Sequence, residues 1–214
     1  MDNRNWAQVE RQALADLFEQ VGPDAPTLCE GWATRDLAAH LVIRESRPDA
    51  SVGILVKPLA AYTARTQKRA ATRPWPDLVA AVRNGPPLLS AFRLPGVDRL
   101  TNLAEFFVHH EDVRRAMPQW EPRELPDAEA EALWRIERGQ ASSQFVRLGI
   151  PALLVRSDGE GGRHIARSGS PQLTITGPAA ELMLFTFGRR SVAQVEVAGD
   201  EQLAAKLRQA SLGF

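Results

Sequence analysis

The hydrophobic pattern of this sequence changes near residue 150, and that change limits the possible folds more than any other feature. Before it, apolar residues such as Trp6, Leu14 and Phe18 recur at helical spacing, which is typical of amphipathic helices. After it, short β-branched runs such as PALLVRSD and QLTITG are separated by glycines, which is typical of strands. We therefore expect an α+β protein, with an antiparallel helical bundle over residues 1–150 and a small α+β domain over 151–214.

The individual elements follow from the same periodicity and from turn residues. Helices are expected over residues 3–21, 35–47, about 76–92, about 98–116 and 127 to about 149, with Thr34 as the N-cap of the second. The stretch 49–73 is less periodic and fits a lid or a short helix. Beyond residue 150 we expect strands over 151–158, 163–169, 172–177 and 193–200, and helices over 177–190 and 201–212.

Charge and composition argue against several classes of partner. Lys and Arg number 26, as do Asp and Glu, and no basic stripe supplies the phosphate contacts that nucleic acids or anionic membranes need. No segment approaches the roughly 18 apolar residues that span a bilayer, and the N-terminal MDNRNWAQVERQ lacks the apolar run of a signal peptide. Cys29 is the single cysteine, so no intramolecular disulfide can form. A cytoplasmic location is expected.

The stretch NLAEFFVHHEDVRRA, residues 102–116, carries the densest set of groups that could do chemistry. Positions i, i+4 and i+7 share a helix face, and Glu105, His109 and Asp112 have that spacing. His110 and Glu111 turn away from this face, by about 100° a step. A glutamate and a histidine one turn apart, facing a bundle interior, form a two-point chelate for a divalent metal.

A third ligand has to come from another helix, and His40 is the obvious candidate. It lies in the middle of the apolar run DLAAHLVI, and Asp36, one turn earlier, could hold its second ring nitrogen. The set His40, Glu105 and His109 would leave a coordination position open, as catalytic zinc sites do. Two histidines and a carboxylate also suit non-haem Fe(II) oxygenases, although that chemistry is normally built on other folds.

Spacing alone is equally consistent with ordinary structural roles for these residues. A histidine on an apolar helix face is more often a hydrogen-bonded core residue than a metal ligand, and a Glu–His pair one turn apart is common on helix surfaces. Asp112 could belong to a solvated helix end, and Cys29 to a small buried position rather than a nucleophile. Arg189 and Arg190 could bind an anionic substrate or simply end a helix in solvent.

Two motifs resemble a known family. In TLCEGWATRDLAAHLVIRE, Cys29, Trp32, Asp36 and His40 have the spacing of the entry motif of the N-terminal domain of mycothiol-dependent maleylpyruvate isomerases, a branch of the DinB-like metal-binding proteins. The segment EFFVHHED is similar to the family's second motif, a glutamate, a histidine and an aspartate, although His110 replaces the glycine that commonly follows the histidine. The resemblance covers about residues 5–150.

The resemblance implies a DinB-like antiparallel four-helix bundle followed by a small α/β C-terminal domain. It implies that His40, Glu105 and His109 bind a divalent metal, usually zinc, and that a low-molecular-weight thiol such as mycothiol is a cofactor. The segments RESRPDA and ITGPAAELMLFTFGRR resemble an actinobacterial metal-binding subgroup in particular.

The expected function is that of a metal-dependent thiol transferase or isomerase. Its partners would be a small-molecule thiol and a small electrophilic substrate, with Arg189 or Arg190 contacting an anionic group of that substrate. A protein that binds metal or a small ligand without turnover is the alternative. The chain is expected to be a monomer or a homodimer.

Overall fold

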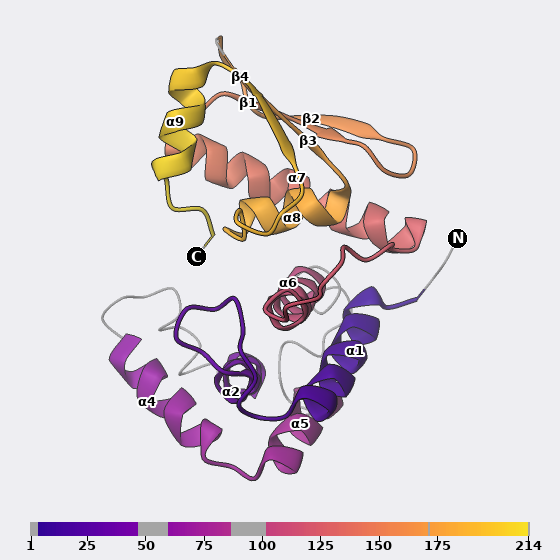
Figure 1. Ribbon diagram of the computed structural model, residues 1–214, viewed down its shortest axis with the longest axis vertical. Helices are drawn as coiled ribbons and strands as arrows, with labels where there is room; N and C mark the ends of the chain where they lie inside the picture. The colour runs from indigo at the N-terminus through magenta and orange to yellow at the C-terminus, as the bar shows by residue number, and fades with distance from the viewer. Residues whose placement is uncertain (1–3, 47–59, 87–101, 171, 214) are drawn as a thin grey trace. The chain divides into compact units, whose positions relative to one another are not determined.

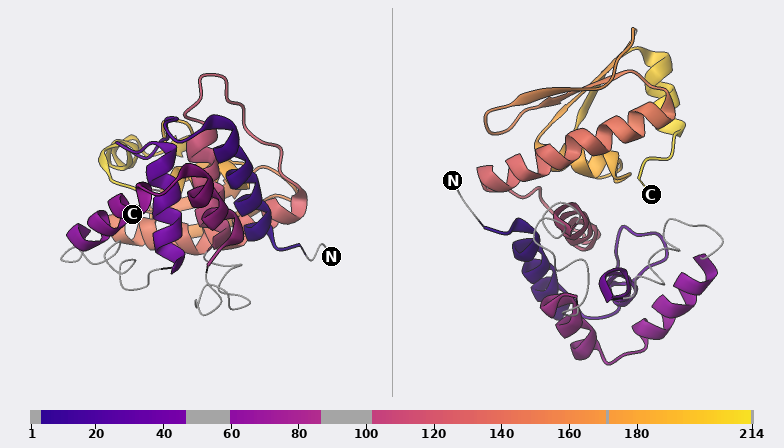
Figure 2. Two further views of the ribbon diagram at one scale, coloured as in Figure 1. Left: turned by 90° about the horizontal axis from the view of Figure 1, so that it is seen from below. Right: turned by 180° about the vertical axis from the view of Figure 1, so that it is seen from behind.

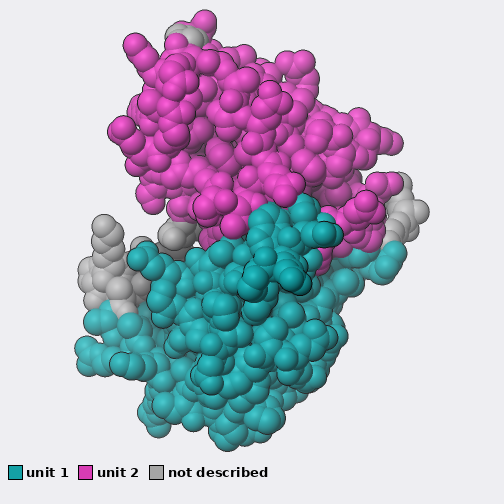
Figure 3. All heavy atoms as spheres, in the orientation of Figure 1, with its two compact units in different colours: residues 1, 3–122 teal, residues 2, 123–214 magenta. Residues whose placement is uncertain are grey.

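The computed structural model describes residues 4–46, 60–86, 102–170 and 172–213. Within these residues the chain forms eight helices and one four-stranded sheet, so the expected mixture of helix and sheet is confirmed. The chain divides into two compact units, the first ending at Pro122 and the second beginning at Arg123 (Figure 3). Among the described residues, no helix is both long and apolar enough to cross a membrane.

The first unit is helical (Figure 1). Its helices are α1 (Trp6–Val21), α2 (Thr34–Ser46), α4 (Ala60–Ala71), α5 (Trp75–Asn84) and α6 (Leu103–Arg114). α1 packs against α5 and α6, and α2 packs against α4 and α5. The four helices expected here are present, and the less periodic stretch contains a short helix, α4. The parts of these predictions that fall on 47–59 and 87–101 lie outside the described residues. Five described helices contribute to the unit, and a bundle of four is not confirmed.

One apolar core holds these helices together. Leu14 and Phe18 of α1, Leu37 of α2, Leu78 of α5 and Phe106 of α6 are all completely buried in it. Burial of each such side chain contributes about 1.5–3 kcal/mol relative to exposure. The core therefore fixes how α6 lies against α1.

The start of α2 differs from the sequence prediction. Thr34 is the first residue of the helix rather than its N-cap, because its hydroxyl donates to the carbonyl oxygen of Gly22, at 2.6 Å, just after α1 ends. The capping acceptor is instead the Asp36 carboxylate, which accepts from the backbone N–H of Ala33 at 3.1 Å. The Asp36 carboxylate thus satisfies a backbone donor at the helix start, which is a different role from the expected support of His40.

The second unit contains the sheet, with strands in the order β2-β1-β3-β4. They are β1 (Ala152–Arg156), β2 (Gly162–Arg167), β3 (Leu173–Gly177) and β4 (Glu196–Gly199), which confirms the four predicted strands. β1 pairs antiparallel with β2 and parallel with β3, and β3 pairs antiparallel with β4. The link from β2 to β3 passes Pro151 at Gly169, where a Cβ atom would lie 2.5 Å from the proline ring.

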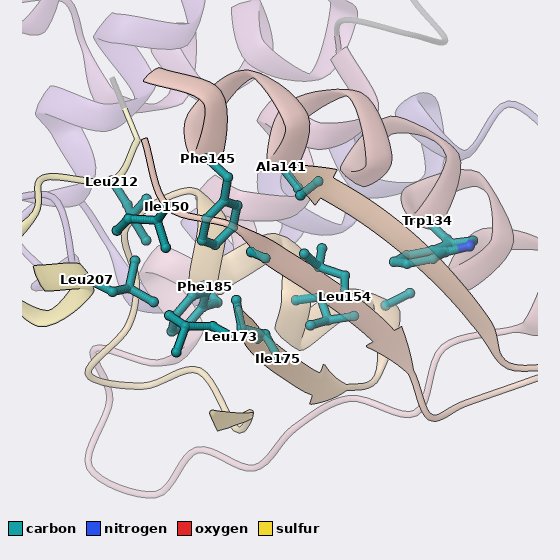
Figure 4. Packing of buried hydrophobic residues seen from close by; sticks show 14 of the residues in the cluster. Trp134, Ala141, Phe145, Ile150, Leu154, Leu173, Ile175, Phe185, Leu207 and Leu212 are labelled. Carbon is teal, nitrogen blue, oxygen red and sulfur yellow. The ribbon is translucent and has the colours of Figure 1, made fainter. Parts of the chain in front are cut away.

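Helices α7 (Asp127–Leu148) and α8 (Ala179–Thr186) cover one face of this sheet, while α9 (Glu201–Gln209) lies beside β4 (Figures 1 and 2). Trp134 and Phe145 of α7 pack with Leu154 and Ile175 of the strands (Figure 4). α7 consequently belongs to the second compact unit, whereas the sequence analysis placed everything up to residue 150 in the bundle. The reason is that its apolar residues are buried in the core of the second unit, together with residues of the strands and of α8.

Candidate metal centre

Helix α6 brings Glu105 and His109 to one face, as their spacing predicts. Glu105 lies in the first turn and His109 one turn later, and the His109 Nε2 atom is 3.4 Å from Glu105 Oε1. Their side chains are 21% and 11% exposed, so the pair is largely removed from solvent. Asn102 precedes the first turn of α6. Its side chain does not cap the helix because it hydrogen-bonds with Arg44 and Glu45 instead.

His40 of α2 completes the expected trio. Its Nε2 atom lies 3.2 Å from Glu105 Oε1, and its ring centre lies 5.4 Å from that of His109. One ligand atom from each of the three residues lies within 4.8 Å of the others. Two imidazole nitrogens and one carboxylate oxygen, so placed, match the donor set of catalytic zinc sites, which keep a fourth position open for water or substrate. The chemistry of these residues therefore fits a divalent metal.

The surroundings give the three groups different protonation states. Burial lowers the pKa of His40, and its hydrogen bond to Glu105 does not offset this. Burial would raise the pKa of Glu105, but hydrogen bonds from His109 and His40, together with the charge of Arg44, hold it well below its usual range. In the metal-free protein, Glu105 is therefore ionised at neutral pH and His40 is largely neutral.

His109 has the opposite shift. Burial would lower its pKa, but the contacts with Asp112, Cys29 and Glu105 hold the pKa of His109 well above its usual range. The ring therefore carries a proton on each nitrogen near neutral pH, and a metal that bound at Nε2 would have to displace one of them.

Asp112 is a buried carboxylate partner of His109, a kind of support that the sequence analysis expected only for His40, from Asp36. The His109 Nδ1–H group donates to Asp112 Oδ2 at 2.8 Å, and the Asp112 side chain is completely buried. This arrangement fixes the ring orientation and directs Nε2 toward Glu105, as carboxylates beside metal-binding histidines do. A solvated helix end is therefore not the role of Asp112.

Cys29 lies beside this pair. Its thiol donates to Asp112 Oδ2 at 3.2 Å, and its sulfur is 3.8 Å from His109 Nδ1. Sulfur, nitrogen and oxygen atoms of these three residues also lie within 4.8 Å of one another. Their hydrogen bonds to each other account for this closeness, so we assign them to the support of His109 rather than to a second metal.

The loop before α2 reaches both histidines. Its middle is anchored on α6, where the backbone N–H of Leu28 donates to the carbonyl oxygen of Asp112 at 3.0 Å. The Thr27 hydroxyl donates to the carbonyl oxygen of Trp32 at 2.8 Å and closes the loop. The Trp32 ring then lies 5.2 Å from the His40 ring, centre to centre. Cys29 and Trp32 of the motif thus lie in one loop, in which Cys29 is next to His109 and Trp32 is next to His40.

Arg44 is a site residue that the sequence analysis missed. It lies one turn after His40 on α2, and its Nε atom is 3.3 Å from Glu105 Oε1. Its Nη1 group donates to Asn102 Oδ1 at 2.6 Å, and the Asn102 amide donates to Glu45 Oε1 at 2.9 Å. The i, i+4 spacing of His40 and Arg44 was the signal that could have found it.

The network ends on a fully buried arginine of α1. Arg11 contacts both carboxylate oxygens of Glu45, at 2.6 and 2.5 Å, and its guanidinium carbon lies 4.1 Å from the centre of the Phe106 ring. The Arg11 side chain is 0% exposed. A chain of polar contacts therefore runs from the interior of the first unit to the oxygen atom of Glu105 that faces both histidines.

The neighbouring residues of α6 lie elsewhere, as their helical directions predict. His110 Nδ1 is 2.9 Å from Glu10 of α1, and the Glu111 carboxylate accepts from Arg114 and Arg115 at 2.7 and 2.6 Å. His110 and Glu111 are therefore held by these partners and are not part of the trio.

Other residues singled out in the sequence lie in the second unit. Arg190 donates to the carbonyl oxygens of Leu207 and Ala210 at the end of α9, and Arg189 donates to the carbonyl oxygen of Phe187 at 2.7 Å. Their contact with a substrate anion stays a prediction. His164 of β2, a histidine outside the trio, has its Nε2 atom 2.8 Å from the Ser142 hydroxyl.

The comparisons with known proteins bear on the fold. The sequence matches no family model and no curated protein sequence. Among solved structures, it is similar to the crystal structure of a mutant of the mycothiol-dependent maleylpyruvate isomerase, with a TM-score of 0.57 over 90% of each chain and 15% sequence identity. At that identity the likeness concerns architecture. The chain thus shares the overall fold of a mycothiol-dependent maleylpyruvate isomerase.

Proposed function

We propose that this protein binds one divalent metal ion, zinc, through His40, Glu105 and His109. The observation that carries the proposal is the convergence of their ligand atoms within 4.8 Å of one another, from two helices that are far apart in sequence. Asp112 supports it further, because a buried carboxylate on the distal nitrogen of His109 is the usual companion of a metal-bound imidazole.

We further propose that the protein is a thiol-dependent transferase or isomerase that acts on a small electrophilic molecule. The fold likeness to a mycothiol-dependent isomerase supports a low-molecular-weight thiol, such as mycothiol, as the cofactor. A bound divalent cation lowers the pKa of a thiol that coordinates it, which makes a nucleophile available at neutral pH. The finer classification, as a DinB-like four-helix bundle of the actinobacterial metal-binding subgroup, and an action in the cytoplasm are part of this proposal.

The chain's own residues have three tasks in this scheme. His40, Glu105 and His109 hold the cation and leave one position open. Asp112 keeps the His109 ring in the tautomer that has Nε2 available. The Trp32 ring covers His40 on one side, which limits the access of water to the ligand set.

Metal content tests the first part of the proposal. Protein purified without a His-tag should contain about one metal ion per chain, and zinc at about 100 times its Kd should stabilise it by about 2.7 kcal/mol. His40→Ala and Glu105→Gln should lose both the metal and the stabilisation. His164→Ala, a histidine outside the trio, is the matched control and should keep both. A wild-type protein that contains no metal and whose stability does not change with added zinc would refute the proposal.

Turnover tests the second part. Zinc-loaded protein with mycothiol and candidate electrophiles should give product only when the thiol is present, and His40→Ala should abolish that reaction. Full metal occupancy without any thiol-dependent turnover would support the alternative, a binding protein without catalysis.

A further inference from the structure

One face of the sheet in the second unit carries no helix of that unit. Leu154 and Ile175 belong to the core that contains residues of α7, α8 and α9, so these helices lie on one side of the strands (Figure 1). Side chains alternate between the two faces along a strand, and the neighbours of these core residues therefore point to the other face. The strand register arranges that face in two rows: Arg163, Val155, Thr176 and Glu196 form the first, and Ile165, Leu153, Thr174 and Ala198 form the second.

The charges on this face lie at its two edges. Arg163 is on the edge strand β2 and Glu196 is on the edge strand β4, and both side chains are exposed. Neither takes part in an ion pair among the residues that the structure describes. Three strand spacings separate them, roughly 14 Å, which is too far for the two side chains of one chain to pair.

The rest of the face is uncharged. Ile165, which occupies the β2 end of the second row, is 59% exposed, while its neighbour Leu153 is buried. Thr174 and Thr176 on β3 are half-buried. The face thus combines an exposed apolar residue with a positive edge and a negative edge.

We propose that this face binds a second copy of the chain, around a two-fold axis that runs parallel to the strands between β1 and β3. Rotation about this axis places β2 of one copy over β4 of the other. Arg163 then meets Glu196 of the partner subunit, and the same pair forms again on the other side of the axis. Ile165 lies over Ala198 of the partner subunit, and the strands of the two sheets are aligned, as in face-to-face sheet packing.

The order of residues in the rows selects this arrangement. A two-fold axis across the strands would place β2 over β2 and would exchange the rows, so that Arg163 would face Ile165 of the partner subunit. That contact would desolvate a charge against an apolar side chain without a partner. Two short rows across four strands also cover less than the roughly 800 Å² per partner of a standard interface, so a weak dimer is expected.

Sedimentation velocity of the full-length protein tests the proposal. Between about 5 and 500 µM the protein should change from monomer to dimer, with a Kd of about 10–200 µM, the weak end of specific association. Arg163→Glu should raise this Kd at least about tenfold, because like charges then face each other twice. The double variant Arg163→Glu/Glu196→Arg restores opposite charges and should return the Kd to within about threefold of the wild-type value. Arg69→Glu changes an exposed arginine of α4 by the same charge and is the matched control, with a Kd within about twofold of wild type.

Recovery of the dimer in the double variant supports the proposed pairing. A protein that stays monomeric throughout this range overturns the inference. A dimer that does not respond to Arg163→Glu, or that does not recover in the double variant, overturns it as well, because another surface or another axis then holds the copies together. Circular dichroism checks that each variant is folded, and Arg163→Gln, which removes the charge without reversing it, should raise the Kd by a smaller factor. None of these outcomes bears on the metal centre, which lies in the first unit.

Discussion

Metal uptake should release one proton near neutral pH. The three ligands enter the reaction in different states, because the pKa of Glu105 lies well below its usual range, that of His40 is lowered by burial, and that of His109 lies well above its usual range. At pH 7 only His109 then has a proton to lose. The expected release is about one proton per metal, so that the apparent affinity rises about tenfold per pH unit up to the pKa of His109, or 1.36 kcal/mol per unit.

Isothermal titration calorimetry with zinc, in two buffers of different ionisation enthalpy, counts the protons directly. Asp112→Asn removes the carboxylate that favours the protonated ring, so the pKa of His109 should fall and the release at pH 7.5 should shrink. Asp36→Asn is the control, because that carboxylate accepts from the backbone of Ala33. A release close to zero in the wild-type protein at pH 7, or an affinity that does not change between about pH 6.5 and 7.5, would refute this assignment of charges.

Three further predictions concern affinity and stability. Asp112→Asn should lower zinc affinity about 10- to 100-fold in a competition titration with a chelator, and unchanged affinity would remove its supporting role. Arg11→Met should cost about 3–5 kcal/mol in urea unfolding, since it leaves Glu45 buried without its cation, whereas Arg83→Met at the surface should cost at most about 1 kcal/mol; equal costs would contradict the argument. Burial raises the pKa of Glu137 well above 4.5, so the native state binds this proton more tightly than the unfolded state and stability is lost as the pH rises above 4.5. Glu137→Gln should remove that loss, and a stability difference between variant and wild type that does not grow from pH 5 to pH 8 would contradict it.

Much of the candidate site could be predicted because it depends on helix geometry. The spacing of Glu105 and His109 places them together on any regular helix, and the same reasoning correctly turned His110 away. His40 was a candidate because it lies in the middle of an apolar run, but periodicity alone does not show which residues of two helices meet, and the resemblance to a family favoured the set of three. That the trio binds metal stays a prediction until it is measured.

The residues that contact the trio from outside could not be predicted, for a different reason. Cys29 and Asp112 are 83 positions apart, and their hydrogen bond depends on how a loop lies across α6. Asp36 was expected to support His40 because it is one turn away. Its carboxylate instead accepts from the backbone N–H of Ala33, which has no partner within the helix at the start of α2.

The boundary between the two units shows a similar limit of periodicity. The pattern in α7 correctly predicts a helix with an apolar stripe, and it contains no information about which partner buries that stripe. Trp134 and Phe145 pack on strands that come later in the chain. A change in local texture at residue 150 therefore marks where strands begin, which is not the place where the compact units divide.

The chain of contacts from Arg11 through Glu45 and Asn102 to Arg44 has a consequence for how such a protein can diverge. Each member satisfies a buried partner, so a substitution at one position leaves a charge or an amide stranded in the interior. The four positions should therefore co-vary among homologues, so that their residues are kept or replaced together. A homologue that has lost Arg11 is then expected to have lost Arg44 as well.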